Sequence, residues 1–192
     1  QYLKRLRIRH QPRISGHDAV HIRPDFHLLG AERRANYGRR EVAAIAGRKM
    51  TPPAIEPVPA AGRAKFAVRL EAPAGCPRFA GRVIQDVDSA ARTPLWMRER
   101  LRRAGLRPIS PIVDVTNYVM LELGQPMHAY DLRRLSTHIE VRSARPGEHL
   151  TLLDGRDIAI EPDTLVIADG AGPVGLAGIM GGEKSGIAAD TT

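Results

Sequence analysis

The chain has 192 residues, of which 43% are apolar, 26% charged and 4% aromatic, a composition typical of a soluble globular domain with a mainly aliphatic core. Residues 164–182 are the most apolar long stretch, but Asp169 and several glycines interrupt them, which excludes a transmembrane helix. The N-terminal residues lack the apolar run of a secretory signal, and a lone Cys76 excludes an internal disulfide, so a cytoplasmic setting is expected.

The net charge of +8 is concentrated at the N-terminus. Residues 1–41 contain ten Lys/Arg and four Asp/Glu, whereas the remaining 151 residues contain nineteen and seventeen. This basic leader shows no sustained helical or strand periodicity. It is either an arm that contacts RNA phosphates or a poorly ordered or misassigned segment, and composition favours the second interpretation.

The next part of the chain changes from a helix to a linker and then to strands. Residues 42–62 contain a helix end, closed by Gly47, and a proline-rich linker. Residues 66–70 alternate apolar and charged side chains, which predicts a half-buried strand, and residues 79–87 predict a second one.

Two helices are expected in the middle of the chain. Residues 93–104 begin with Thr93 as the N-cap and place Leu95, Leu101 and Ala104 toward the core. Four arginines cover the rest of this helix; they either contact RNA or form a solvated face, and the solvated face is the commoner case. Residues 114–123 predict a second helix, with Asp114 as its cap.

The remaining residues predict strands, after a short turn at residues 130–135. Ile139 and Val141 alternate with charge, residues 150–160 predict a hairpin with a type I′ turn at Asp154 and Gly155, and residues 164–168 and 174–180 predict two more strands. The fold class expected is therefore α+β, with a mostly antiparallel sheet and packed helices.

No common catalytic or metal-binding signature occurs in the sequence. There is no P-loop, dinucleotide-binding fingerprint, zinc motif or nucleophile elbow. The glycine-rich residues 178–182 indicate a tight turn or a close approach to a ligand rather than a phosphate cradle.

Several sequence segments resemble those of one protein family. They are TPLWM at 93–97, VDVTNYV at 113–119, ELGQPMHAYD at 122–131, LDG at 153–155, DTLVIAD at 163–169 and GIMGGE at 178–183. In this order they resemble the β subunit of bacterial phenylalanyl-tRNA synthetase, in the region of its editing domain.

The resemblance implies a subunit of a class II aminoacyl-tRNA ligase. The family is a heterotetramer of two α and two β subunits, in which the α subunit holds the aminoacylation site with its ATP and Mg. The resemblance implies phenylalanine tRNA and the α subunit as partners, with no membrane contact and no cofactor or metal in this chain. Its own chemistry would be hydrolysis of tyrosine misacylated to phenylalanine tRNA.

The family's editing pocket matches three residues of this chain: His128, Arg107 and Gly181. The resemblance implies that His128 orients water or a ribose hydroxyl, that Arg107 holds the terminal phosphate or ribose of the tRNA, and that Gly181 permits close backbone approach to the substrate. Taken alone, the residues favour simpler roles: His128 would cap helix carbonyls, and Arg107 would pair with Asp114.

The resemblance divides the chain into a leader with a poor match (1–41), a helix end and linker (42–62), and the N-terminal part of the editing domain (63–192), truncated at its C-terminal end. The family's pattern continues into a further strand with an acidic residue that reads the tyrosine hydroxyl. Three functions remain open: an editing hydrolase domain, a non-catalytic tRNA-binding or scaffold fragment of the same subunit, and a free-standing RNA-binding protein.

Overall fold

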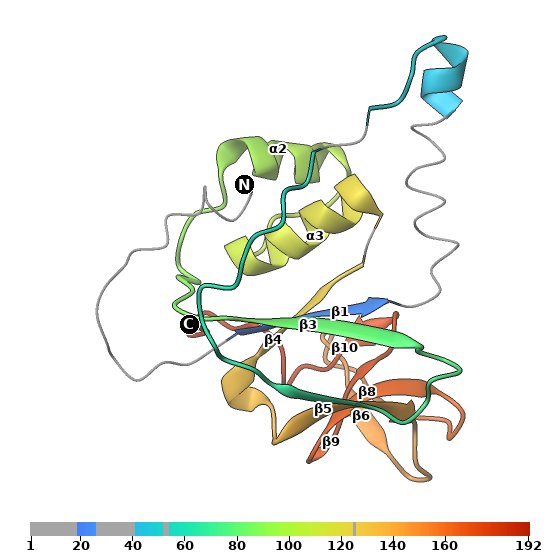
Figure 1. The fold of residues 1–192 in the computed structure, drawn as a ribbon. Coiled ribbons are helices and arrows are strands. Elements are labelled where there is room, and N and C mark those ends of the chain that lie inside the picture. Colours follow the sequence, from blue (N-terminus) through green and yellow to red (C-terminus); the bar gives the residue numbers. More distant parts are fainter. Residues whose placement is uncertain (1–18, 26–40, 52–53, 125) are drawn as a thin grey trace.

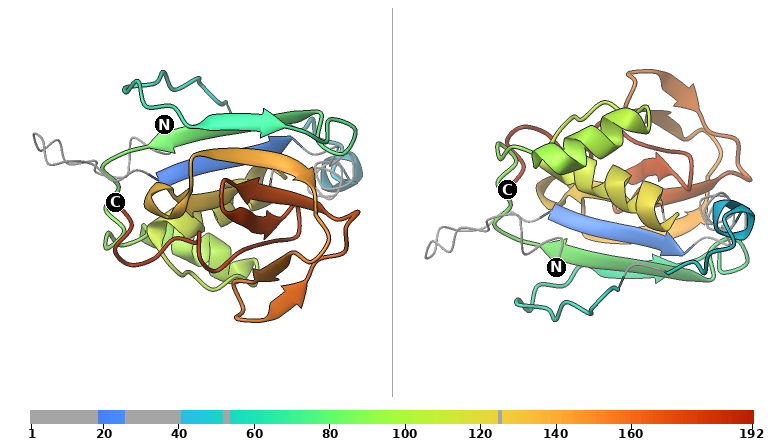
Figure 2. Two further views of the ribbon diagram at one scale, coloured as in Figure 1. Left: turned by 90° about the horizontal axis from the view of Figure 1, so that it is seen from below. Right: turned by 90° about the horizontal axis from the view of Figure 1, so that it is seen from above.

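The structure is a computed structural model that describes residues 19–25, 41–51, 54–124 and 126–192. Most of these residues form three layers: two helices, a three-stranded sheet and a five-stranded sheet (Figure 1). The helices lie on one side of the three-stranded sheet, and the five-stranded sheet lies on its other side (Figure 2). The helices are α2 (Leu95–Arg103) and α3 (Pro111–Leu123), and residues 41–45 form a separate short helix.

The three-stranded sheet is antiparallel and has the order β3-β1-β4. Its strands are β1 (Ala19–Asp25), β3 (Arg78–Ile84) and β4 (His128–Asp131). Nothing in the sequence pattern predicts β1, which belongs to the basic leader and contains Pro24. Its two neighbours come from distant parts of the chain, and such non-local pairing leaves little local signal. The rest of the leader, residues 1–18 and 26–40, lies outside the described residues.

The five-stranded sheet has the order β10-β9-β8-β5-β2. Ile139 and Val141 of its strand β5 are fully buried, as their alternation predicted. β2 pairs with β5 in parallel and the other pairs are antiparallel, so the expected α+β class with a mostly antiparallel sheet is confirmed. The strands are β2 (Ala67–Leu70), β5 (His138–Ser143), β8 (Leu165–Asp169), β9 (Gly172–Leu176) and β10 (Met180–Gly181).

The core has three parts. The first is buried between the two sheets, the second lies between the five-stranded sheet and the hairpin of β6 (His149–Thr151) and β7 (Asp157–Ala159), and the third joins α2 to α3. The first part contains Cys76, Tyr130, Ile139, Val141, Ile167 and Val174. The strand predicted at residues 66–70 forms as β2, but all four of its residues are exposed because it lies at the sheet edge.

The hairpin forms as predicted, but the type I′ turn is wrong. A type I′ turn needs positive φ at both central residues. Gly155 has φ 81°, whereas Asp154 is not among the residues with positive φ. The N–H of Gly155 donates to the carbonyl of Leu152 at 2.9 Å, which gives a tight turn that ends in a left-handed glycine.

Two predicted helix caps are also wrong. The N-cap of α2 is Pro94, and the hydroxyl of Thr93 instead donates to buried Asp114 at 2.5 Å. The N-cap of α3 is Ser110, whose hydroxyl accepts from the N–H of Val113. Asp114 therefore links the starts of the two helices, because it also accepts from the N–H of Ile109 at 2.8 Å.

The predicted core face of α2 is only partly correct. Leu101 is fully buried and Met97 is 3% exposed, but Leu95 is 71% exposed and Ala104 is also exposed. Leu95 lies on the opposite side of the helix from the buried pair. None of the helices in the described ranges has the length and apolar character that a membrane span requires.

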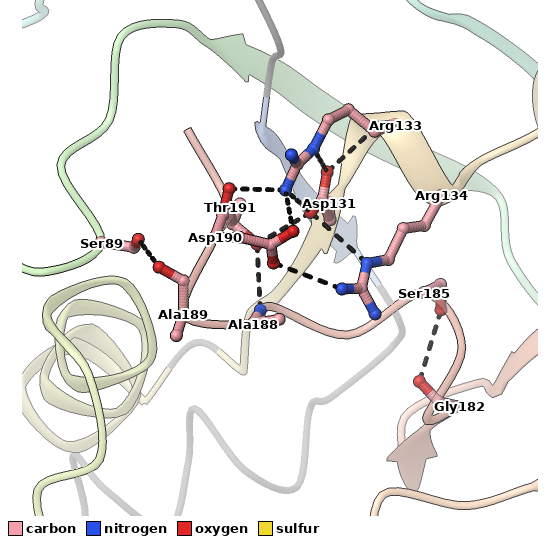
Figure 3. Close-up of polar contacts among 10 residues, drawn as sticks. All are labelled: Ser89, Asp131, Arg133, Arg134, Gly182, Ser185, Ala188, Ala189, Asp190 and Thr191. Carbon is pink, nitrogen blue, oxygen red and sulfur yellow. Dashed lines mark hydrogen bonds and ion pairs between the residues drawn. The ribbon is translucent and has the colours of Figure 1, made fainter.

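Polar contacts of Asp131 attach the last residues of the chain to β4 (Figure 3). Asp131 is fully buried and accepts from the side chain of Arg133 at 2.8 and 3.1 Å and from the hydroxyl of Thr191 at 2.8 Å. Arg133 and Arg134 also pair with Asp190. Residues 183–192 thereby lie against the strand that contains His128.

The same contacts predict acid sensitivity. Burial by itself raises the pKa of Asp131, but the hydrogen bonds from Arg133 and Thr191 outweigh it and hold the pKa below its ordinary value of 3.8. The unfolded chain therefore binds this proton at higher pH than the folded chain does. The stabilisation is complete above about pH 4 and is lost as the pH falls through the folded-state pKa.

We expect the free energy of unfolding in urea to fall more steeply below about pH 4 in the wild-type chain than in Asp131→Asn. Other carboxyl groups with lowered pKa, such as Glu148, contribute equally to both curves and cancel in the comparison. Parallel curves for the two proteins would show that Asp131 does not titrate with folding.

Candidate functional site

Strand β4 places His128 and Tyr130 on the same side of the three-stranded sheet, because they are two residues apart. Their rings meet edge to face, with centroids 4.4 Å apart and planes at 72°. Tyr130 is 2% exposed, and burial raises the pKa of its phenol. His128 is half-buried, with its Nε2 atom buried. The two rings therefore lie at the interface between the sheets.

Two glycines of the five-stranded sheet, Gly175 and Gly181, lie opposite the two rings. Residues 174–180 were predicted as one strand, which is wrong: the chain turns after Leu176 and divides them between β9 and β10. Gly178 has φ 70°, and the N–H of Ile179 donates to the carbonyl of Leu176 at 3.1 Å. The glycine-rich residues thus make the tight turn that was expected, and Gly181 pairs with Gly175 across the two strands.

The two glycines allow the two rings to approach the backbone closely. A Cβ atom on Gly181 would overlap the imidazole ring of His128. A Cβ atom on Gly175 would lie 3.4 Å from the hydroxyl of Tyr130. His128 and Gly181, which the resemblance assigns to one pocket, are therefore in direct contact.

Gly181→Ala should lower the free energy of unfolding by about 1–3 kcal/mol, because the added methyl group must displace the His128 ring. Gly175→Ala is the matched control: it adds the same group at the paired position, where the nearest atoms are 3.4 Å away, and should cost less. Urea unfolding of the two variants measures the difference. Equal losses would mean that the contact with His128 imposes no constraint on position 181.

Arg107 lies in the loop between α2 and α3 with its side chain exposed. Among the described residues, neither a hydrogen bond nor an ion pair joins it to His128 or Gly181, so its place in the site stays a prediction. The alternative partner, Asp114, is 1% exposed and is occupied by Thr93 and Ile109. No ion pair within the described ranges includes Arg107.

The end of α3 shows whether His128 caps the helix carbonyls, as the simpler interpretation of the sequence suggested. Gly124 adopts the left-handed conformation with φ 72°, and its N–H donates to the carbonyl of Met120 at 2.8 Å. This glycine closes the helix in the usual way. His128 lies four residues later, within β4 and against Gly181.

Tyr130 is the site residue that sequence reasoning missed. It was assigned to a turn, although His128 and Tyr130 already show the two-residue spacing of a strand face. Its buried ring packs edge to face against the His128 imidazole. In the ranges that the structure describes, no group of three or more His, Cys, Asp or Glu side chains is arranged to hold a metal ion.

Comparison with known proteins identifies the family. The B3/4 domain family matches residues 75–192. The phenylalanine–tRNA ligase β subunits of Pectobacterium atrosepticum and Hahella chejuensis are 53% and 55% identical to the chain over 152 residues, which is 79% of the chain and 19% of each relative. The β subunit of Nitrosococcus oceani is 55% identical over 148 residues.

The chain spans about a fifth of the length of these relatives. The match includes β3, β4, all strands of the five-stranded sheet except β2, and both helices of the first layer. The resemblance to the β subunit, first seen in the sequence words, is confirmed by these identities. The chain therefore belongs to the B3/4 domain family.

Proposed function

We propose that this chain is the B3/4 part of a phenylalanine–tRNA ligase β subunit, and that the complete domain hydrolyses tyrosine esterified to phenylalanine tRNA. The relatives are named as β subunits of that ligase. The observation that carries the proposal is the contact between the His128 ring and the Gly181 backbone. It brings together two residues of the family's editing pocket that no local sequence pattern forces together.

The chemical need for such a site follows from the limits of binding. A hydrophobic pocket that accepts phenylalanine rejects an analogue with one added hydroxyl by only about a hundredfold. A second pocket that hydrolyses the tyrosyl ester removes the remaining errors. Hydrolysis needs a positioned water and polar groups near the scissile carbonyl and the terminal ribose.

In the proposed site, His128 orients the water or the ribose hydroxyl. The imidazole suits this role because it can accept and donate a proton near neutral pH. Tyr130 packs against the ring, and the lack of a side chain at Gly181 lets the ring lie directly against the backbone of β10. Arg107, exposed at the α2–α3 loop, would bind the terminal phosphate or ribose.

The partners proposed are those of the family: phenylalanine tRNA and an α subunit, in a heterotetramer of two α and two β subunits. The aminoacylation site with its ATP and Mg belongs to the α subunit, so the chain by itself should not catalyse phenylalanine-dependent ATP–pyrophosphate exchange. The proposed setting is the cytoplasm, where translation takes place.

Deacylation of tyrosyl-tRNA tests the proposal directly. The protein is a ligase whose β subunit carries residues 75–192 of this chain in place of its own B3/4 segment. This chimera should release tyrosine from the tRNA faster than the spontaneous rate. Release at the spontaneous rate, with aminoacylation intact, would contradict the proposed function.

A further inference from the structure

The positive charge of the described chain is concentrated around α2. Residues 92–107 contain six arginines and one acidic residue, Glu99, a formal balance of +5. All of residues 42–192 together have a balance of only +2. The rest of this part of the chain is therefore slightly acidic, and the arginines form a local feature rather than a share of an evenly basic surface.

Packing directs these arginines outward. Met97 and Leu101 form the buried side of α2 and contact Tyr118 of α3. The side chains of Arg102 and Arg103 are 65% and 77% exposed. Four exposed arginines, Arg98, Arg102 and Arg103 of α2 and Arg92 in the loop before it, are together called the α2 arginine face below.

Among the residues that the structure describes, one carboxylate pairs with this face. Glu99 accepts from Arg102 at 2.9 and 3.2 Å and pairs with Arg103 at 3.8 Å. Within the described residues, neither an ion pair nor a hydrogen bond engages the guanidinium groups of Arg92 and Arg98. Exposed ion pairs contribute little stability, so they do not account for the number of arginines.

A fifth arginine, Arg100, holds α2 against α3. Arg100 lies 5.4 Å from the ring centre of Trp96 and 5.8 Å from that of Tyr118, and it donates to the Tyr118 hydroxyl. Trp96 and Tyr118 also meet edge to face, with centroids 5.2 Å apart. These contacts join α2 to α3, so the arginine face is presented on a well-packed pair of helices.

The opposite end of the molecule is acidic. Residues 148–169, which include the β6–β7 hairpin and β8, contain six acidic residues and one arginine, a balance of −5. In Figure 1 this segment lies in the lower part of the molecule, and the three-stranded sheet lies between it and α2 at the top. An extended polyanion is therefore attracted to the helical layer and repelled by the hairpin.

We propose that the α2 arginine face binds the phosphodiester backbone of RNA. Guanidinium groups match phosphate geometry, and a row of them on a firmly packed helix binds a regularly charged backbone without reading its sequence. The choice of RNA among polyanions rests on the proposed function, in which the substrate is a tRNA. The binding itself needs no hydrolytic chemistry.

The test measures the Kd of the full chain for unacylated phenylalanine tRNA across a series of salt concentrations. Arg98→Gln with Arg103→Gln removes two charges from the face and leaves Arg107 unchanged. Each lost phosphate contact should raise Kd by about eightfold at 0.1 M salt and reduce the slope of log K against log salt by about 0.9. Glu99→Gln, which removes the carboxylate that pairs with Arg102 and Arg103, should lower Kd.

Arg69→Gln with Arg156→Gln is the matched control, because it removes two exposed charges from the five-stranded sheet and the hairpin. Equal losses in both pairs would overturn the proposal, since net charge alone would then explain them. An unchanged Kd in the α2 pair would also overturn it and would assign binding to the leader, which every variant retains. If the α2 double variant loses binding to anionic lipid vesicles but still binds tRNA, the partner of the face is a membrane surface and not RNA.

The two proposals fail separately. If the chimera hydrolyses tyrosyl-tRNA but the α2 double variant binds tRNA normally, the proposed function stands and the role of the α2 arginine face in RNA binding is refuted. If the α2 double variant binds tRNA more weakly but the chimera does not hydrolyse tyrosyl-tRNA, the role of the α2 arginine face stands and the proposed function is refuted.

Discussion

His128→Ala is expected to slow tyrosyl-tRNA hydrolysis by about 10²–10⁴, which is the range for loss of a group that transfers a proton or orients the attacking water. The measurement is single-turnover deacylation by the ligase chimera that carries residues 75–192. The free energy of unfolding should change by about 1 kcal/mol, since the ring is half-buried and packs against Tyr130 and the Gly181 backbone.

His149→Ala is the matched control, because His149 is 58% exposed on the hairpin and pairs with exposed Asp157. It should leave the deacylation rate unchanged. A loss near tenfold in His128→Ala, about 1.4 kcal/mol, would indicate that the ring positions the ribose rather than the water. An unchanged rate in His128→Ala would show that the site is assigned to the wrong residue.

Asp131→Ala should lower the free energy of unfolding by about 2–4 kcal/mol. The fully buried carboxylate accepts from Arg133 and from Thr191, which is also fully buried, and its removal leaves their donors unsatisfied. The estimate is moderated because the Arg133 side chain is 25% exposed and water can replace part of the interaction. Equilibrium unfolding in urea at pH 7 measures the effect.

Asp190→Ala is the control, since Asp190 pairs with the same two arginines but its side chain is 67% exposed. It should cost less than about 0.5 kcal/mol. Asp131→Ala should also make residues 183–192 more sensitive to protease, because Thr191 loses its partner. Equal stability losses in the two variants would contradict the role assigned to burial.

The parts of the fold that the sequence predicted are those with a local pattern. Alternation marks β5, whose Ile139 and Val141 are fully buried, and Gly124 marks the end of α3 through its left-handed conformation. Both signals lie within a few residues of the element that they describe. The α+β class follows from such signals taken together.

The parts that the sequence did not predict depend on distant partners. β1 is a strand because it pairs with β3 and β4, and the partner of Ala19 in β4 is Asp131. Asp114 has the residue type and place of a helix cap, but its carboxylate is occupied by Thr93, twenty-one residues earlier. Residue type and spacing cannot distinguish a cap from a buried link between two helices.

The candidate site shows the same division. The resemblance to the family placed His128 and Gly181 together, whereas no local pattern joins a residue at the start of β4 to one in β10. The role of Tyr130 became apparent from its buried ring, because the sequence around it indicates a turn as readily as a strand. Among the described residues, no hydrogen bond or ion pair joins Arg107 to the other two, and its assignment depends on the resemblance alone.

The measurement that tests the central claim most directly compares two substrates on one enzyme. The chimera is mixed with tyrosyl-tRNA and with phenylalanyl-tRNA, both made on phenylalanine tRNA, and the two hydrolysis rates are recorded. The account predicts rapid release of tyrosine and near-spontaneous release of phenylalanine, with the first lost in His128→Ala. Equal rates for the two esters, or tyrosine release that does not depend on His128, would contradict it.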